Sequence, residues 1–216
     1  MPLATTVVTH AQFKFARFAQ GLSYADFLSR ATVNRDKFDE SYQSVPLTDE
    51  DLSFFRKVAA LPHGPAKILA LAEAWCGDVY RELPTAVRIA EATGMDLRIF
   101  LRDENPDIMD EFLSNEGKSR AIPVFVFYTA DLQYITHFTE RSASAHAGLA
   151  LAKDEAIAQL NLPKTATFGN LPDAESQVFL REVIARIRPY SDQWRKDAIK
   201  EIRELLSTAL KIPNAG

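Results

Sequence analysis

The chain has 216 residues, of which 47% are apolar and 25% charged, a composition typical of a globular protein with one core and appended helices. The formal net charge of −4 gives no basic field, so we expect no nucleic-acid partner. No apolar run approaches the roughly 20 residues that cross a bilayer, and the N-terminus lacks the basic start and long apolar centre of a secretory signal. We therefore expect no membrane association and a cytoplasmic location.

The first part of the chain predicts a helical extension followed by a linker. Residues 11–30 suggest two helical segments, with Ser23 as the N-cap of the second. Aromatic side chains are frequent here: Phe13, Phe15, Phe18, Tyr24 and Phe27. They either pack the extension onto the rest of the protein or line a groove over Cys76. Residues 34–47 are polar and lack a regular spacing, so we expect a linker there.

The middle of the chain predicts a helix, a buried strand and a second helix. Residues 48–51 have the pattern of a capping box, which favours a helix of about three turns. The short apolar run 68–72 is typical of a central strand buried on both faces. Apolar residues then recur every three or four positions over 79–90, which predicts an amphipathic helix that ends at Gly94.

Cys76 lies where this strand and the second helix meet, and it is the only cysteine of the chain. A single cysteine excludes an intrachain disulfide and a cysteine-rich metal site, and the four histidines are scattered, so we expect no metal and no cofactor. The free N–H groups of a helix start stabilise a thiolate, which is the nucleophilic form of cysteine. The negative charge of Asp78 opposes this effect, and the sequence leaves the sign of the sum open.

The remaining elements predict a mixed sheet followed by helices. Residues 97–101 alternate apolar and polar side chains, as a strand parallel to the first would. Residues 105–117 predict a helix, and residues 123–128 and 134–138 predict an antiparallel hairpin. After position 140 the pattern is helical only: residues 145–158, 178–187 and 194–209.

The motif Trp-Cys-Gly-Asp at 75–78, placed between an apolar strand and a helix, resembles the active-site segment of the thioredoxin family. Pro84 stands eight positions after Cys76, where that family has a helix-kinking proline. Ile122 and Pro123 resemble the loop that carries a cis-proline opposite the cysteine. The match covers roughly residues 48–141, and the chain resembles in particular bacterial thioredoxin-like proteins with a Trp-Cys-Gly-Asp motif and a helical N-terminal extension.

Two positions depart from the family pattern. Val79 stands where the family has its second, resolving cysteine, and Ala70 stands where it has a buried carboxylate. The resemblance implies a thioredoxin-like α/β fold, with a central mixed sheet of about four strands flanked by helices. We expect residues 1–47 to be a helical extension packed on the core, 48–141 to be the core, and 142–216 to be a helical C-terminal extension.

The expected function depends on Cys76 as the catalytic residue. The resemblance implies monothiol disulfide exchange or mixed-disulfide formation, with a protein or a low-molecular-weight thiol or disulfide as partner. The residues expected to bind this partner surround the cysteine: Trp75, Gly77, Asp78, Val79, Ile122 and Pro123. One alternative is a non-catalytic protein-interaction or chaperone-like module, and another is that Cys76 is a buried structural residue. Glu73 stands where a peroxide-reducing relative would have threonine, which disfavours that activity, whereas the C-terminal helices leave a relationship to glutathione transferases open.

Overall fold

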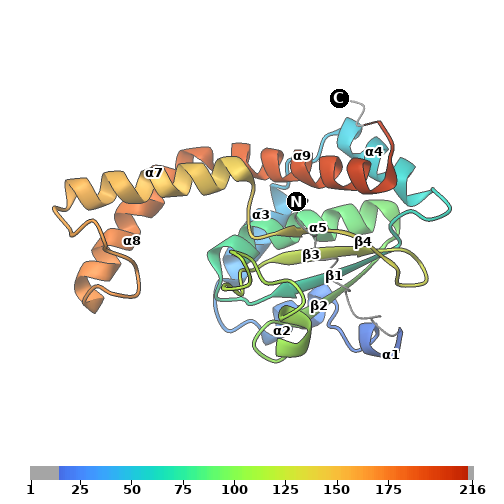
Figure 1. The fold of residues 1–216 in the computed structure, drawn as a ribbon, viewed down its shortest axis with the longest axis horizontal. Helices are drawn as coiled ribbons and strands as arrows, with labels where there is room; N and C mark the ends of the chain where they lie inside the picture. The colour runs from blue at the N-terminus through green and yellow to red at the C-terminus, as the bar shows by residue number, and fades with distance from the viewer. Residues whose placement is uncertain (1–14, 214–216) are drawn as a thin grey trace, which may run out of the picture. The chain divides into compact units, whose positions relative to one another are not determined.

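The computed structural model describes residues 15–213 and is shown in Figure 1. The described chain divides into two compact units. The first comprises residues 15–140 and 199–213, and the second comprises residues 141–198. The first unit therefore combines most of the predicted N-terminal extension with the predicted core and also includes the end of the last helix.

Four strands form one mixed sheet in the first unit, in the order β2-β1-β3-β4. Their bounds are β1 (Lys67–Ala72), β2 (Asp96–Leu101), β3 (Val124–Tyr128) and β4 (Tyr134–Thr139). β1 pairs parallel with β2 and antiparallel with β3, and β3 pairs antiparallel with β4. β1 is central because its apolar side chains from Ile68 onward are all buried, as the sequence indicates. The predicted α/β fold with a mixed sheet of four strands is confirmed.

Capping residues explain where two helices of the first unit begin or end. α4 (Asp49–Ala59) begins at a capping box in which the Thr48 side chain and the Asp51 carboxylate each accept a backbone N–H of the other residue. α5 (Gly77–Thr93) begins after Cys76 and ends at Gly94, whose φ of 74° is the left-handed conformation that favours glycine. α5 packs on β1 and β2, and α4 packs on α5.

The N-terminal extension packs on this core through three short helices: α1 (Phe15–Phe18), α2 (Tyr24–Arg30) and α3 (Arg35–Gln43). The Ser23 side chain caps α2, as predicted, by accepting the N–H of Asp26. Leu22 forms an antiparallel bridge with Ile99 at the edge of the sheet. Phe13 lies outside the described residues, as do residues 1–12.

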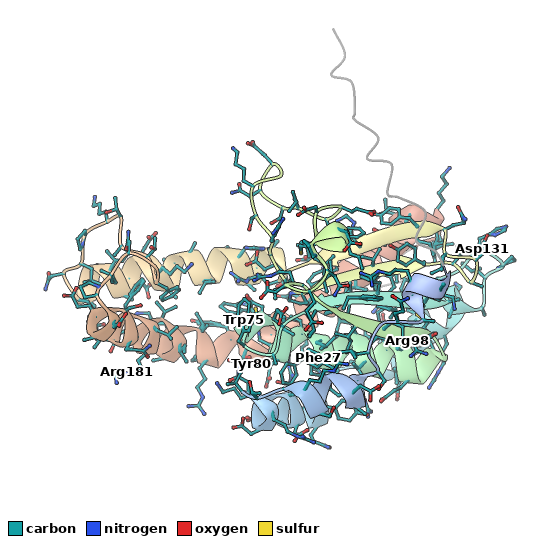
Figure 2. All side chains as sticks on the ribbon, turned by 90° about the horizontal axis from the view of Figure 1, so that it is seen from below. Phe27, Trp75, Tyr80, Arg98, Asp131 and Arg181 are labelled. Atoms are coloured by element: carbon teal, nitrogen blue, oxygen red, sulfur yellow. The ribbon has the colours of Figure 1, made fainter. Side chains whose placement is uncertain are left out.

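The predicted linker at 34–47 is wrong over most of its length, because α3 occupies it. Most side chains of α3 are polar and face solvent, whereas Phe38 is fully buried. The Phe38 ring makes edge-to-face contacts with Phe27, at 5.4 Å between centroids, and with Tyr80 of α5, at 6.2 Å. Figure 2 labels Phe27 and Tyr80 at this junction. Aromatic contacts, including a stack of Tyr42 on Tyr24 at 5.9 Å between centroids, therefore hold a helix whose sequence shows no apolar stripe.

The predicted helix at 105–117 is also too long, since α6 (Pro106–Met109) is a single turn. The chain then enters a bridged turn between Ser114 and Ser119, with positive φ at Asn115, Glu116 and Gly117. Ile108, Met109 and Phe112 are buried, so the apolar side chains that predict a helix anchor a turn instead.

The second unit is helical, with α7 (Ala143–Gln159), α8 (Asp173–Ile187), the 3₁₀ turn η1 (Arg188–Tyr190) and the start of α9 (Ser191–Leu210). Its core consists of four buried side chains from α7 and α8: Ala152, Ala156, Phe179 and Val183. The second half of α9 belongs to the first unit. None of the helices within residues 15–213 is both long and apolar enough to cross a membrane.

Candidate functional site

Strand β1 and helix α5 place Cys76 at the carboxyl edge of the sheet. The Cys76 N–H donates to the Glu73 carbonyl oxygen at 3.1 Å, which turns the chain after β1. The Tyr80 N–H then donates to the Cys76 carbonyl oxygen at 3.2 Å, so Cys76 is the N-cap of α5. The thiol is free of any disulfide and half-buried. The structure thus places the sulfur at a helix N-terminus, as the sequence predicts.

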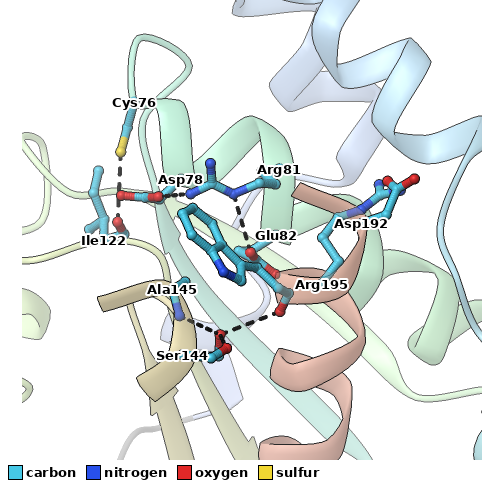
Figure 3. Close-up of polar contacts among 11 residues, drawn as sticks. Cys76, Asp78, Arg81, Glu82, Ile122, Ser144, Ala145, Asp192 and Arg195 are labelled. Carbon is cyan, nitrogen blue, oxygen red and sulfur yellow. Dashed lines mark hydrogen bonds and ion pairs between the residues drawn. The ribbon is translucent and has the colours of Figure 1, made fainter. Parts of the chain in front are cut away.

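The loop before β3 lies next to this sulfur. Leu71 near the end of β1 pairs with Val124 at the start of β3, so the residues just before Val124 meet the loop just after β1. Cys76 Sγ lies 3.7 Å from the Ile122 carbonyl oxygen and donates a weak hydrogen bond to it, as Figure 3 shows. The bond between Ile122 and Pro123 is cis, as the family resemblance implies.

A charged network occupies the first turns of α5, next to Cys76. Asp78 forms an ion pair with Arg81, and Arg81 Nε also lies 3.4 Å from the Glu82 carboxylate (Figure 3). Glu82 is only 1% exposed. The guanidinium of Arg81 compensates the negative charge that Asp78 would otherwise present to a thiolate. Arg81 and Glu82 were absent from the sequence prediction, although the three-residue spacing of Asp78 and Arg81 is typical of a helix ion pair.

Two of the predicted binding residues differ in their surroundings. Val79 is fully buried in the core, so its side chain does not contact a partner directly. It influences binding only through the helix start that it helps to hold. Gly77 is exposed, and a Cβ built there would lie 3.8 Å from the Tyr80 hydroxyl, an ordinary contact distance. The structure therefore sets no steric requirement for glycine at this position.

Trp75 presents an exposed indole just before the cysteine, with 52% of its surface accessible. The Arg102 guanidinium lies over this ring, 4.9 Å from its centroid, in a cation–π contact. Arg102 was not among the predicted site residues. It follows β2, which runs parallel to β1 with Leu101 opposite Ala72, so the two strands leave the sheet at the same edge.

Glu73 and Asn34 hold the loop that carries Trp75 and Cys76. The Glu73 carboxylate is buried and accepts the Asp103 N–H at 2.9 Å. Burial raises the pKa of Glu73 above its usual value, and this outweighs the opposing effect of the Asp103 N–H. Asn34, at the start of α3, donates its side-chain N–H to the Ala74 carbonyl oxygen at 2.9 Å. The extension therefore touches the loop of the candidate site.

Among residues 15–213, no group of three His, Cys, Asp or Glu side chains is placed to hold a metal ion. The chemistry that these side chains offer is that of a thiol that follows an exposed indole in the chain and lies beside a carbonyl oxygen and an ion-paired carboxylate.

Comparisons with known proteins bear on the family and the fold. The family model described as thioredoxin matches residues 21–156. No curated protein matches the chain. A crystal structure of a protein of unknown function from Pseudomonas aeruginosa superposes with a TM-score of 0.59 at 15% identity, covering 91% of this chain and 99% of that one. An HIV epitope-scaffold superposes with a TM-score of 0.57 at 13% identity, with the same coverage. These two structures share the fold.

Proposed function

The chain belongs to the thioredoxin family, and we propose that it carries out monothiol disulfide exchange with Cys76 as the reacting thiol. The observation that supports this most is the position of the sulfur, half-buried at the N-terminus of α5. The N–H groups of a helix start stabilise a thiolate, and incomplete burial leaves the sulfur open to a disulfide. Compensation of Asp78 by Arg81 acts in the same direction.

The exchange takes place in two steps. The Cys76 thiolate attacks one sulfur of a disulfide R–S–S–R′, the Cys76–S–S–R bond forms, the original sulfur–sulfur bond breaks, and R′–S⁻ leaves and takes a proton from water. Val79 supplies no second thiol, so the thiolate of an external thiol then attacks the R–S sulfur. This second attack joins the external thiol to R–S and restores the Cys76 thiolate. Over both steps one external thiol is oxidised into the new disulfide with R–S, R′–S is reduced to a thiol, and the protein is unchanged.

The partner in this proposal is a protein or a low-molecular-weight disulfide. Trp75 and Gly77 are exposed before and after the thiol, and Ile122 and Pro123 are the buried residues of the loop whose Ile122 carbonyl oxygen lies 3.7 Å from the sulfur. The need for an external thiol fits a reducing compartment such as the cytoplasm, where glutathione is abundant.

The proposal is tested with the intact chain and glutathione disulfide under native conditions. We expect one mixed disulfide per chain by mass spectrometry, its release by excess glutathione, and a catalysed exchange between glutathione and hydroxyethyl disulfide. Cys76→Ser should abolish all three. If Cys76 reacts with glutathione disulfide only after the protein is unfolded in urea, the thiol is structural and the proposal is wrong.

A non-catalytic binding role is the second candidate, favoured by the exposed Trp75 indole. Tryptophan is enriched at protein interfaces, where its ring buries a large area and its N–H finds a partner. The two candidates give different results in a capture experiment with proteins that carry accessible disulfides. A binding module retains its partner in Cys76→Ser and loses it in Trp75→Ala, whereas an exchange enzyme loses covalent capture in Cys76→Ser.

A further inference from the structure

Glu73 is a buried carboxylate that the exchange mechanism does not use. It directly follows β1 at the carboxyl edge of the sheet, three residues before Cys76. A buried carboxylate is costly unless it is hydrogen-bonded, so its contacts indicate what it holds in place. The Glu73 carboxylate accepts the Asp103 N–H at 2.9 Å, in the loop after β2.

The same loop fixes Arg102 over Trp75. Arg102 N–H donates to the Ala72 carbonyl oxygen at 3.3 Å and so extends the pairing of β2 with β1 by one residue. The Arg102 side chain then makes two further bonds, from Nε to the Asp103 carboxylate at 2.8 Å and from Nη1 to the Arg120 carbonyl oxygen at 3.3 Å. These bonds hold the guanidinium plane against the Trp75 ring.

We propose that Glu73 is a positioning residue for Cys76: by binding the Asp103 amide it fixes Arg102 on Trp75, and so fixes the indole that precedes the reacting thiol. The inference deepens the proposed exchange function and rests on it. Trp75 is 52% exposed, and an exposed indole without such a support samples several rotamers. With Arg102 on one ring face, the indole presents a fixed apolar surface to the disulfide that approaches Cys76.

The orientation of Trp75 is measurable apart from any thiol chemistry. The chain has two tryptophans, so Trp194→Phe leaves Trp75 as the only one. In this background we expect Glu73→Ala and Arg102→Gln to increase acrylamide quenching of Trp75 fluorescence. Both should also slow exchange with glutathione disulfide by about 2- to 12-fold, the effect of one lost hydrogen bond.

Two further variants separate positioning from charge and from general loop damage. Glu73→Gln keeps an oxygen that accepts the Asp103 N–H, so it should retain wild-type quenching and exchange. Glu104→Ala removes an exposed carboxylate from the same loop and should change neither quantity. If Glu73→Ala does not fold, Arg102→Gln carries the same test.

The outcomes are distinct. A folded Glu73→Ala with unchanged quenching and unchanged exchange overturns the positioning role, as does an Arg102→Gln protein that behaves like wild type. Slower exchange in Glu73→Gln equal to that in Glu73→Ala also overturns it, because charge rather than the hydrogen bond would then matter. If the wild type shows no exchange but Glu73→Ala still increases quenching, the hold on Trp75 is supported and the proposed function fails.

Discussion

At the scale of single residues, Asp78 has two opposing effects in the first turn of α5. Its carboxylate lies near the positive end of the helix dipole, which stabilises the helix start. The same negative charge disfavours a thiolate at Cys76. Arg81 forms an ion pair with Asp78 and therefore weakens the second effect. The charge around the Cys76 sulfur therefore depends on Asp78 and Arg81 together.

Replacing Asp78 should separate the two effects. We expect Asp78→Asn to increase the rate of Cys76 alkylation by iodoacetamide at pH 7 about two- to fivefold, because a like charge is removed. The same change should lower the free energy of unfolding by about 0.3–1 kcal/mol through the weaker helix start. Both are measured on the native protein, by mass spectrometry and by urea titration.

Asp96→Asn is the matched control for this change. Asp96 also pairs with an arginine, with Arg98 Nε at 2.8 Å from its carboxylate. It lies at the start of β2, at the amino ends of the parallel strands β1 and β2, whereas Cys76 follows the carboxyl end of β1. Asp96→Asn should be alkylated at the wild-type rate. If Asp78→Asn is also alkylated at the wild-type rate, Asp78 has no influence on the thiol.

At the scale of elements, helix α5 supplies both the N-terminus that holds Cys76 and the buried position of Val79. We expect Val79→Cys to form a disulfide with Cys76, because the two side chains stand three residues apart at the helix start. The introduced thiol would then attack the Cys76 sulfur of a mixed disulfide, so that the partner leaves as a thiol and an intrachain disulfide forms, which an external reductant must reduce before the next turnover.

Val79→Cys is checked by the loss of both free thiols on oxidation and by the reduction of a test protein disulfide with dithiothreitol as electron donor. Ala86→Cys is the control, since Ala86 is buried in the same helix ten residues from Cys76, about 15 Å along its axis. Ala86→Cys should form no intrachain disulfide. If Val79→Cys also forms none while it is folded, the proposed geometry of the helix start is wrong.

A second relation between elements is the ion pair that joins the end of α9 to the start of α4. Arg203 donates to the Asp51 carboxylate at 2.7 Å and to the Glu50 carboxylate at 2.8 Å. Burial alone would raise the pKa of Asp51, but hydrogen bonds from Thr48 and Arg203 outweigh it and hold that pKa below its usual value. The pair between Arg203 and Asp51 is buried, so losing one partner leaves a buried charge.

We expect Arg203→Met to lower the free energy of unfolding by about 2–4 kcal/mol at pH 7. Because the pKa of Asp51 is depressed in the folded protein, its stabilisation is present above the usual value of 3.8 and is lost as the pH falls through the folded value. The difference from wild type should therefore narrow below pH 4 in urea titrations. Lys200→Met, which removes an exposed pair with Glu204, should cost less than about 1 kcal/mol, and an equal cost for both variants would contradict the prediction.

At the scale of the whole molecule, the parts that followed from the sequence are those with a local signal. The buried run of β1, the caps at Ser23 and Thr48, the C-cap at Gly94 and the place of Cys76 at a helix start each depend on neighbouring residues. The family pattern added the approach of Ile122 to the thiol.

The parts that the sequence missed depend on contacts between distant segments. α3 is held by the Phe38 ring against Phe27 and Tyr80 and by Tyr42 against Tyr24, and no periodic pattern signals these contacts. Arg102 reaches Trp75 only because β1 and β2 pair in a specific parallel register. A prediction of that register from sequence would have brought Arg102 and Asp103 to the site.

The two compact units also have separate cores, which leads to a prediction about local stability. Phe179 is fully buried among Ala152, Ala156 and Val183, all within residues 141–198. Phe179→Ala removes the largest side chain of this core, a change that costs about 3–5 kcal/mol where the site cannot collapse. We expect amides of α7 and α8 to lose hydrogen-exchange protection, whereas amides of β1 and β3 keep theirs, because each unit unfolds around its own core.

Phe125→Ala provides the reverse case, since Phe125 is buried in β3 of the first unit and stacks on Phe138. Phe125→Ala should reduce the hydrogen-exchange protection of backbone amides in the sheet. The chain connects the two units through α9, which runs from one into the other, so coupling along this helix is the competing expectation. If Phe179→Ala lowers protection in β1 and β3 as much as in α7 and α8, the molecule unfolds as one cooperative body and the two cores are not independent.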